Sequence, residues 1–184
     1  NVPIQQCLTR VLQQEREAMI CYVDIDSFKP FNDIYGYAKG DEVLLCLAQC
    51  LNERVDPTCD FVGHIGGDDF LLVLSSKDWR KRLQLLQEDF QGQCLRFYKP
   101  EHLQAGCFSA TNRQGQRQEF SLLTLSIGVV HLHPQACAQL DAGQLAELAS
   151  QAKHHAKGVP GYSLHIVDTL MTGNQSPNSA ARAS

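Results

Sequence analysis

The sequence has no long apolar segment and no excess of positive charge. No apolar run approaches the roughly 20 residues that a membrane-spanning helix needs, and the N-terminus lacks the pattern of a signal peptide. The 184 residues carry a formal net charge of −4. We therefore expect a cytoplasmic protein that contacts neither nucleic acid nor an anionic membrane by broad electrostatic attraction.

Several common motifs are also missing. No G-x-x-x-x-G-K-[ST] run and no G-x-G-x-x-G run occurs, which argues against the parallel-sheet nucleotide folds that use those turns. The eight cysteines form no C-x-x-C pair, and Cys21, Cys46 and Cys50 lie inside apolar segments. We interpret the cysteines as buried thiols in a reducing compartment rather than as disulfides or metal ligands.

Histidines occur in two close pairs. His131 and His133 have the spacing of a metal-binding pair, and His154 and His155 are adjacent. Since neither pair has Cys or Glu partners at matching spacings, we interpret all four as structural or surface residues.

The apolar pattern predicts interleaved helices and strands within one domain. Two short strands flank the GGDD run and must pair as a hairpin, so this order indicates an α/β fold with a mixed or mostly antiparallel central sheet flanked by helices. The segment 27–39 is expected to be a loop with a short helical piece, 92–120 a loop or hairpin insertion, and 168–184 a disordered polar tail. The expected helices cover 3–15, 41–54, 78–90 and 144–157, and the expected strands 19–23, 60–62, 70–74, 122–131 and 163–167.

The run HIGGDDFLLV, residues 64–73, interrupts an apolar stretch with two glycines and two aspartates. Read alone, Gly66 to Asp69 is an ordinary hairpin turn. A second acidic pair, Asp24 and Asp26, follows the first predicted strand. If the two strands are sheet neighbours, up to four carboxylates converge and repel one another, which a divalent cation relieves. Such oxygen ligands favour Mg²⁺, with Mn²⁺ as the alternative.

Solvated turn aspartates would explain either acidic pair alone. They are a poor explanation for both pairs beside Phe28 and Lys29, whose backbone N–H groups could cradle a phosphate. Metal ions held by such a cluster could activate an attacking hydroxyl and neutralise the charge on the phosphates of a nucleotide.

The run DIDSFKPFNDIYGYAKGDEVL, followed by HIGGDDF, resembles the GGDEF domain family, the diguanylate cyclases. LSIGVV (125–130) resembles the family's later strand, and LASQAKHHAKG (148–158) resembles its last helix. The likeness covers 1–167, which we expect to form one GGDEF domain. NVPI at the start and the insertion are similar to GGDEF modules that follow EAL and CBS domains in bacterial signalling proteins, so we expect upstream regulatory domains.

The resemblance implies a palm-like nucleotidyl cyclase fold and an activity that needs two domains. Two GTP-bound domains face each other and condense their substrates to cyclic di-GMP and pyrophosphate, with bound Mg²⁺ or Mn²⁺. The residues implied by similarity are Asp24, Asp68 and the Ile25 carbonyl as metal ligands; Asp68, Asp69 and Lys29 in catalysis; and Phe28, Lys29, Asn32, Asp41, Gly66, Gly67 and Lys157 in binding GTP, with Asn32 and Asp41 reading the guanine edge.

Some positions depart from the family pattern. Asp69 stands where the family usually has Glu, and His64 stands where it usually has Arg. Gly161 occupies the position at which a second phosphate-binding Arg is expected. In the inhibitory R-x-x-D motif, Pro57 replaces the Arg while Asp60 is retained, so we expect no product inhibition through that motif. Two main hypotheses stay open: an active cyclase, or a weak or inactive GTP-binding module that controls an attached domain such as an EAL phosphodiesterase. A purely structural dimerisation domain fits less well.

Overall fold

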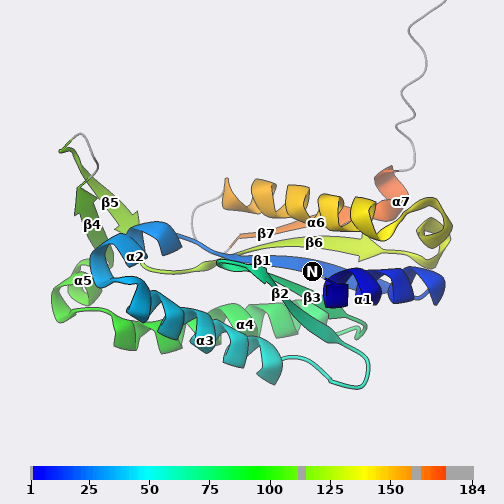
Figure 1. Ribbon diagram of the computed structural model, residues 1–184, viewed down its shortest axis with the longest axis horizontal. Helices are drawn as coiled ribbons and strands as arrows, with labels where there is room; N and C mark the ends of the chain where they lie inside the picture. The colour runs from blue at the N-terminus through cyan, green and yellow to red at the C-terminus, as the bar shows by residue number, and fades with distance from the viewer. Residues whose placement is uncertain (1, 112–114, 159–162, 173–184) are drawn as a thin grey trace, which may run out of the picture.

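The computed structural model describes residues 2–111, 115–158 and 163–172. A five-stranded sheet lies between two layers of helices, and a separate two-stranded hairpin projects from one end (Figure 1). The strands are β1 Ala18–Ile25, β2 Phe61–Gly66, β3 Asp69–Leu74, β4 Cys107–Thr111, β5 Arg117–Ser121, β6 Leu125–Leu132 and β7 Ser163–Asp168. The helices are α1 Val2–Gln13, α2 Phe28–Tyr35, α3 Tyr37–Glu53, α4 Trp79–Cys94, α5 Pro100–Ala105, α6 Ala142–Lys157 and α7 Thr169–Thr172, with short 3-10 turns η1 Leu95–Phe97 and η2 Pro134–Gln139.

The strand order in the main sheet is β2-β3-β1-β6-β7, which makes β1 the central strand. All neighbouring pairs are antiparallel except β6 and β7, which are parallel. The predicted α/β fold with a mostly antiparallel central sheet is therefore confirmed. The GGDD hairpin imposes the antiparallel pairing at one edge, and the long connection through α6 allows the parallel pairing at the other.

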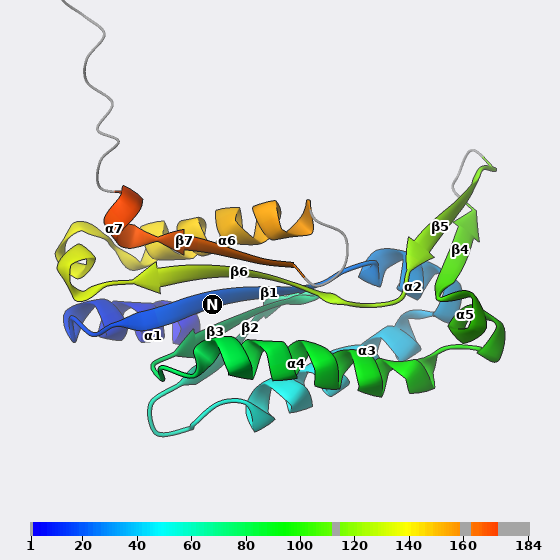
Figure 2. The ribbon, with the colours of Figure 1, turned by 180° about the vertical axis from the view of Figure 1, so that it is seen from behind.

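The two faces of the sheet bury separate cores. Side chains alternate along β1, so Met19, Cys21 and Val23 pack under α3 and α4, whereas Ala18 and Ile20 pack against α1 and α6. Figure 2 shows α3 and α4 together on one side of the sheet and α6 on the other. Tyr22 and Asp24 follow the same alternation, which directs Asp24 toward α6.

Several expected boundaries shift. The loop expected over 27–39 is helical for most of its length, because α2 and α3 are separated only by Gly36, whose φ of 86° stops α2. Helix α6 begins at Ala142 because Asp141 and Gln144 form a reciprocal capping box, with hydrogen bonds of 2.8 and 2.9 Å.

The 92–120 insertion contains the expected hairpin, formed by β4 and β5, but it is preceded by the end of α4, η1 and α5. The expected disordered tail is wrong at its start. Asp168 belongs to β7 and helix α7 follows it, held by Thr169, whose hydroxyl donates to the His131 carbonyl at 3.0 Å. Residues 173–184 lie outside the described part.

All eight cysteines are free thiols, and five of them are buried, as predicted. Within the described residues, no helix is both long enough and apolar enough to cross a membrane.

Candidate active site

Acidic side chains from two neighbouring strands meet at one end of the sheet. Strand β1 pairs with β3 in a register that sets Val23 opposite Phe70. The next residue of β1, Asp24, therefore lies beside Asp69, the first residue of β3. Asp68 immediately precedes Asp69 in the tight turn between β2 and β3. The two strands that carry the acidic pairs are therefore neighbours in the sheet, as the prediction of converging carboxylates requires.

The fourth carboxylate, Asp26, is engaged by β6 and the segment before it. Its oxygens accept hydrogen bonds from Thr124 Oγ1 at 2.8 Å and from Ser126 Oγ at 2.6 Å. Ser126 Oγ also lies 3.0 Å from Ser163 Oγ on β7. Asp26 therefore ties the chain after β1 to its neighbours, and the acidic cluster consists of Asp24, Asp68 and Asp69.

Two lysines from α6 pair with this acidic cluster. Lys153 Nζ lies 2.9 Å from Asp69 Oδ1, 3.3 Å from Asp24 Oδ2 and 4.3 Å from the centre of the Tyr22 ring. Lys157 Nζ, one helical turn further on, lies 2.6 Å from Asp24 Oδ1. The family resemblance points to Lys157, whereas Lys153 is not among the residues that the sequence predicts for the site.

A sequence signal for Lys153 does exist. The buried stripe of α6 runs through Leu145, Ala149, Ala152 and Ala156, and Lys153 falls on this stripe. A lysine is rarely buried unless a carboxylate pairs with it. The close approach of α6 to the sheet depends on Gly128 in β6, because a Cβ there would lie 2.0 Å from the backbone nitrogen of Lys153.

Burial dominates the electrostatics of the site. Asp24 is only 3% exposed. Burial raises the pKa of Asp24 to about 6, against the opposing effect of Lys157, and the negative charge of Asp68 adds to the rise. Burial alone would lower the pKa of Lys153, but its hydrogen bond to Asp69 and the charge of Asp24 outweigh this and raise it. Lys153 is therefore charged at neutral pH and lies between the two carboxylates.

The donor set fits a divalent cation that prefers oxygen ligands. Oδ1 of Asp24 is buried and accepts no well-formed hydrogen bond, although Lys157 pairs with it. Asp68 is half-buried beside it, and Ile25 brings its carbonyl to the same strand end. Lys153 is the competing cation, because its ammonium group already lies between Asp24 and Asp69.

The GGDD turn leaves open space beside the cluster. Gly66 has a φ of 153° and Gly67 a φ of 58°, and a Cβ at either position would meet nothing within 4 Å. The His64 ring stacks on Phe70 with centroids 4.5 Å apart, and its Nε2 donates to the Gly67 carbonyl at 2.9 Å. His64, in place of the family's Arg, therefore stabilises the conformation of the turn.

Two residues, Asp26 and Ser27, separate the end of β1 from the N-terminus of α2. Ser27 takes a left-handed conformation, with φ 61° and ψ 19°, and Phe28 and Lys29 begin the helix. First-turn N–H groups have no partner within their own helix and attract anions. Pro30 has no N–H, so Phe28 and Lys29 are the donors that this turn can offer ahead of Phe31, which bonds to the Ser27 carbonyl.

Asn32 lies against Gly40, the residue before Asp41, where α2 meets α3. Asn32 Oδ1 is buried without a hydrogen-bond partner. It lies so close to Gly40 that a Cβ there would be 1.9 Å away, and Asp41 follows Gly40 directly with an exposed side chain. Asn32 thus offers an acceptor that has no partner within the described residues, and Asp41 offers an exposed carboxylate.

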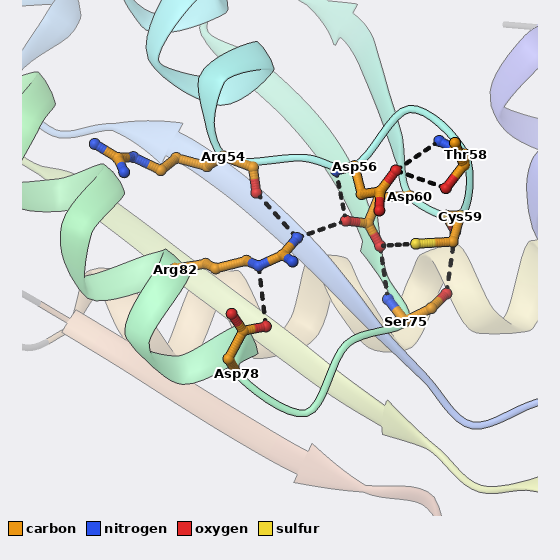
Figure 3. Close-up of polar contacts among 8 residues, drawn as sticks. All are labelled: Arg54, Asp56, Thr58, Cys59, Asp60, Ser75, Asp78 and Arg82. Atoms are coloured by element: carbon orange, nitrogen blue, oxygen red, sulfur yellow. Dashed lines mark hydrogen bonds and ion pairs between the residues drawn. The ribbon is translucent and has the colours of Figure 1, made fainter.

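Asp60 lies apart from the acidic cluster and joins three segments (Figure 3). Its side chain is 0% exposed and accepts from Arg82 Nη1 at 2.8 Å. It also accepts from the backbone N–H groups of Asp56 and Ser75, each at 2.9 Å. These contacts give Asp60 a structural role that does not depend on an Arg at the position of Pro57. Gly161 lies outside the described residues.

Comparison with known proteins places these features in one family. Residues 2–159 match the model of the family described as "Diguanylate cyclase, GGDEF domain". The bifunctional diguanylate cyclase/cyclic di-GMP phosphodiesterase MucR of Pseudomonas aeruginosa is 28% identical over 75 residues, which cover 41% of this chain and 11% of MucR. A diguanylate cyclase of Vibrio cholerae is 44% identical over 62 residues, which cover 33% of this chain and 19% of that protein. The matched segments are thus a small part of both relatives.

Solved structures support the fold. The GGDEF domain of YfiN, also called TpbB, from Pseudomonas aeruginosa superposes with a TM-score of 0.62 at 21% identity, over 90% of this chain and 91% of that one. The family match covers most of the chain and includes the acidic cluster, the GGDD turn and α2. The chain therefore belongs to the GGDEF domain family of diguanylate cyclases.

Proposed function

We propose that this domain condenses two molecules of GTP into cyclic di-GMP and two molecules of pyrophosphate. Each 3′-hydroxyl attacks the α-phosphorus of the other GTP, a phosphodiester bond forms, and the bond to the β-phosphate breaks. Each hydroxyl gives up its proton and each pyrophosphate departs. The observation that carries the proposal is the convergence of Asp24, Asp68 and Asp69 with Lys157 beside the N-terminus of α2.

Binding of the triphosphate uses three elements of this strand end. The N–H groups of Phe28 and Lys29 would hold phosphate oxygens, and Lys157 would move from Asp24 to the phosphates. Gly66 and Gly67 leave room for the substrate to approach the turn. GGDEF diguanylate cyclases are generally metal-dependent. Here Asp24, Asp68 and the Ile25 carbonyl would hold Mg²⁺ or Mn²⁺, which would supply activation of the hydroxyl and neutralisation of phosphate charge.

Selection of guanine is assigned to Asn32 and Asp41. Guanine presents N–H donors on its Watson–Crick edge, and the carboxylate of Asp41 can accept two of them. The unpartnered Oδ1 of Asn32 supplies a further acceptor next to Gly40. Adenine has neither an N1–H nor a 2-amino group, so it would leave these acceptors without their donors, which disfavours its binding.

Catalysis by this geometry requires two copies of the domain. One site holds one GTP, and the attacking hydroxyl comes from the GTP of the other copy. Asp69 and Lys29 would assist the reaction on each side, and upstream regulatory domains would control how the copies meet. Asp69 stands in place of the longer Glu and accepts a hydrogen bond from Lys153 at 2.9 Å, so it would have to exchange this partner to assist the reaction.

The position of Lys153 favours one alternative function. An ammonium group already bridges Asp24 and Asp69, so the domain would bind GTP while its chemistry is weak or absent. Such a domain would act as a GTP-binding regulatory module for an attached domain, for example an EAL phosphodiesterase.

The test incubates concentrated protein with GTP and Mg²⁺, or with Mn²⁺, and separates the nucleotides by chromatography. Asp68→Ala is the test variant, and Asp33→Ala, an exposed aspartate on α2, is the matched control. Cyclic di-GMP formed by the wild type and Asp33→Ala, but lost in Asp68→Ala, supports the cyclase. Intact GTP that still binds by calorimetry supports the regulatory module, and absence of GTP binding overturns both proposals.

A further inference from the structure

Four side chains with metal-ligand chemistry meet at the other end of the sheet. Strand register sets Met19 opposite His131 in β6, and His131 opposite Asp168 in β7. Glu17 lies two residues before Met19, and His133 two residues after His131. Paired residues of neighbouring strands share a face, so His131 and Asp168 point to the same side of the sheet. Glu17 and His133 lie just outside β1 and β6, and their ligand atoms meet that of His131.

The distances between these groups are short. One ligand atom from each of Glu17, His131 and His133 lies within 4.8 Å of those of the other two. His131 Nε2 is 2.6 Å from Glu17 Oε1, and His133 Nε2 is 3.1 Å from Asp168 Oδ1. The two imidazole rings have centroids 3.9 Å apart, and His131 Nδ1 is 3.8 Å from Asp168 Oδ2.

The backbone that carries these groups is fixed by its own contacts. Thr169 Oγ1 accepts from the His133 N–H at 3.1 Å and donates to the His131 carbonyl at 3.0 Å. Asp168 Oδ1 accepts from the backbone N–H of Leu170 at 2.9 Å, which orients its carboxylate toward His133. The arrangement thus rests on paired strands and a hydrogen-bonded strand end rather than on a loose surface loop.

We propose that Glu17, His131 and His133, supported by Asp168, form a binding site for a transition-metal ion such as Zn²⁺. Two imidazole nitrogens and one carboxylate are a ligand set that Zn²⁺ takes in proteins, with Asp168 or water as the fourth ligand. Mg²⁺ and Ca²⁺ prefer sites made of oxygen atoms alone. The histidine site would therefore favour a transition-metal ion, whereas the acidic cluster would favour Mg²⁺. The two carboxylates offset the charge of a divalent ion.

The sequence interpretation of His131 and His133 changes as a result. No partner occurs at a matching spacing in the sequence, but Glu17, just before β1, and Asp168, at the end of β7, supply partners. The site is also separate from the GTP site. Glu17 and Asp24 are seven residues apart along an extended strand, which is about 23 Å, and the ends of β6 and β7 lie away from α2 (Figure 1).

The proposed consequence of metal binding is that three strand ends are held together. A bound ion would tie the segment that joins α1 to β1 to the ends of β6 and β7. Metal binding would therefore stabilise the folded domain and leave the GGDD turn untouched.

The test titrates the full chain with Co²⁺ as a spectroscopic probe and with Zn²⁺ in competition, in millimolar Mg²⁺ to occupy the acidic cluster. We expect one equivalent of Co²⁺ with a visible spectrum of tetrahedral nitrogen and oxygen ligands, and a rise in melting temperature with Zn²⁺. His131→Ala and His133→Ala should each weaken binding by about 100-fold, and Asp168→Asn, as a supporting group, by about 10-fold.

The control is His154→Ala, an exposed histidine on α6 that should leave the affinity unchanged. Circular dichroism checks that each variant is folded. Three results would overturn the proposal: no Co²⁺ binding, binding that survives both histidine variants but is lost in Asp24→Asn, or a thiolate charge-transfer band that assigns the ion to cysteine.

Discussion

Replacing Lys153 with methionine tests whether this lysine competes with the metal ion at the acidic cluster. The change keeps a long side chain on the buried stripe of α6 and removes the ammonium group that lies 2.9 Å from Asp69 and 3.3 Å from Asp24. We expect Lys153→Met to bind Mn²⁺ or Mg²⁺ more tightly than the wild type.

The magnitude follows from the geometry. Lys153 Nζ lies 3.3 Å from Asp24 Oδ2, so a metal ion bound about 2.1 Å from that oxygen would lie at most about 5 Å from the ammonium nitrogen. Repulsion between a dication and a monocation at that distance is about 1.7 kcal/mol in water and about 7 kcal/mol at an effective dielectric constant of 20. Because the flexible lysine can retreat from the ion, the lower figure applies, and it corresponds to an affinity gain of at least about 10-fold.

The assay measures Mn²⁺ binding by electron paramagnetic resonance without nucleotide, together with the melting temperature with and without metal. Lys81→Met, an exposed lysine on α4, is the charge-matched control and should behave like the wild type. Without metal, Lys153→Met should melt at a lower temperature, because the buried Asp24 keeps only Lys157. A folded Lys153→Met variant with unchanged or weaker Mn²⁺ affinity would refute the competition.

Two further predictions concern the fold and the pH dependence of the site. Gly128→Ala should destabilise the domain by about 3 kcal/mol in urea unfolding, because its Cβ would meet the backbone of α6 at 2.0 Å. Gly92→Ala, with open space around the new methyl, should instead be neutral or stabilising. Equal effects at both positions would contradict the packing argument. The pKa of Asp24, which burial raises to about 6, predicts that Mn²⁺ binding weakens as the pH falls through 6, because a proton then competes with the ion. In the metal-free protein, Asp24 stays protonated in the folded state between pH 3.8 and about 6, whereas it is ionised in the unfolded state. The free energy of unfolding should therefore decrease as the pH rises across that window and stay level above it. If neither the Mn²⁺ affinity nor the free energy of unfolding changed with pH in this way, Asp24 would ionise normally.

The sequence by itself determined the fold class and most of the local elements. Apolar periodicity marks the central strand, the GGDD hairpin and the helices that cover the sheet, because burying one face of each element requires that pattern. The family resemblance then named the residues of the acidic cluster. Boundaries set by capping, such as the start of α6 at Ala142 after its N-cap Asp141, were less visible in the apolar pattern, because the capping box lies outside it.

Tertiary structure alone decided which distant groups meet. Asp26 belongs with Thr124 and Ser126 rather than with the metal ligands because β6, about a hundred residues later in the chain, lies beside β1. Lys153 reaches Asp24 because Gly128 lets α6 approach the sheet closely. Strand order is fixed by the packing of both faces at once, which no local pattern records.

The histidine pair shows the same limit most clearly. The spacing of His131 and His133 is visible in the sequence, but Glu17 and Asp168 lie more than thirty residues away on either side. Only the antiparallel pairing of β1 with β6 and the parallel pairing of β6 with β7 bring the four side chains to one face. A ligand set assembled across strands has no spacing rule along the chain, because its geometry depends on register rather than on sequence distance.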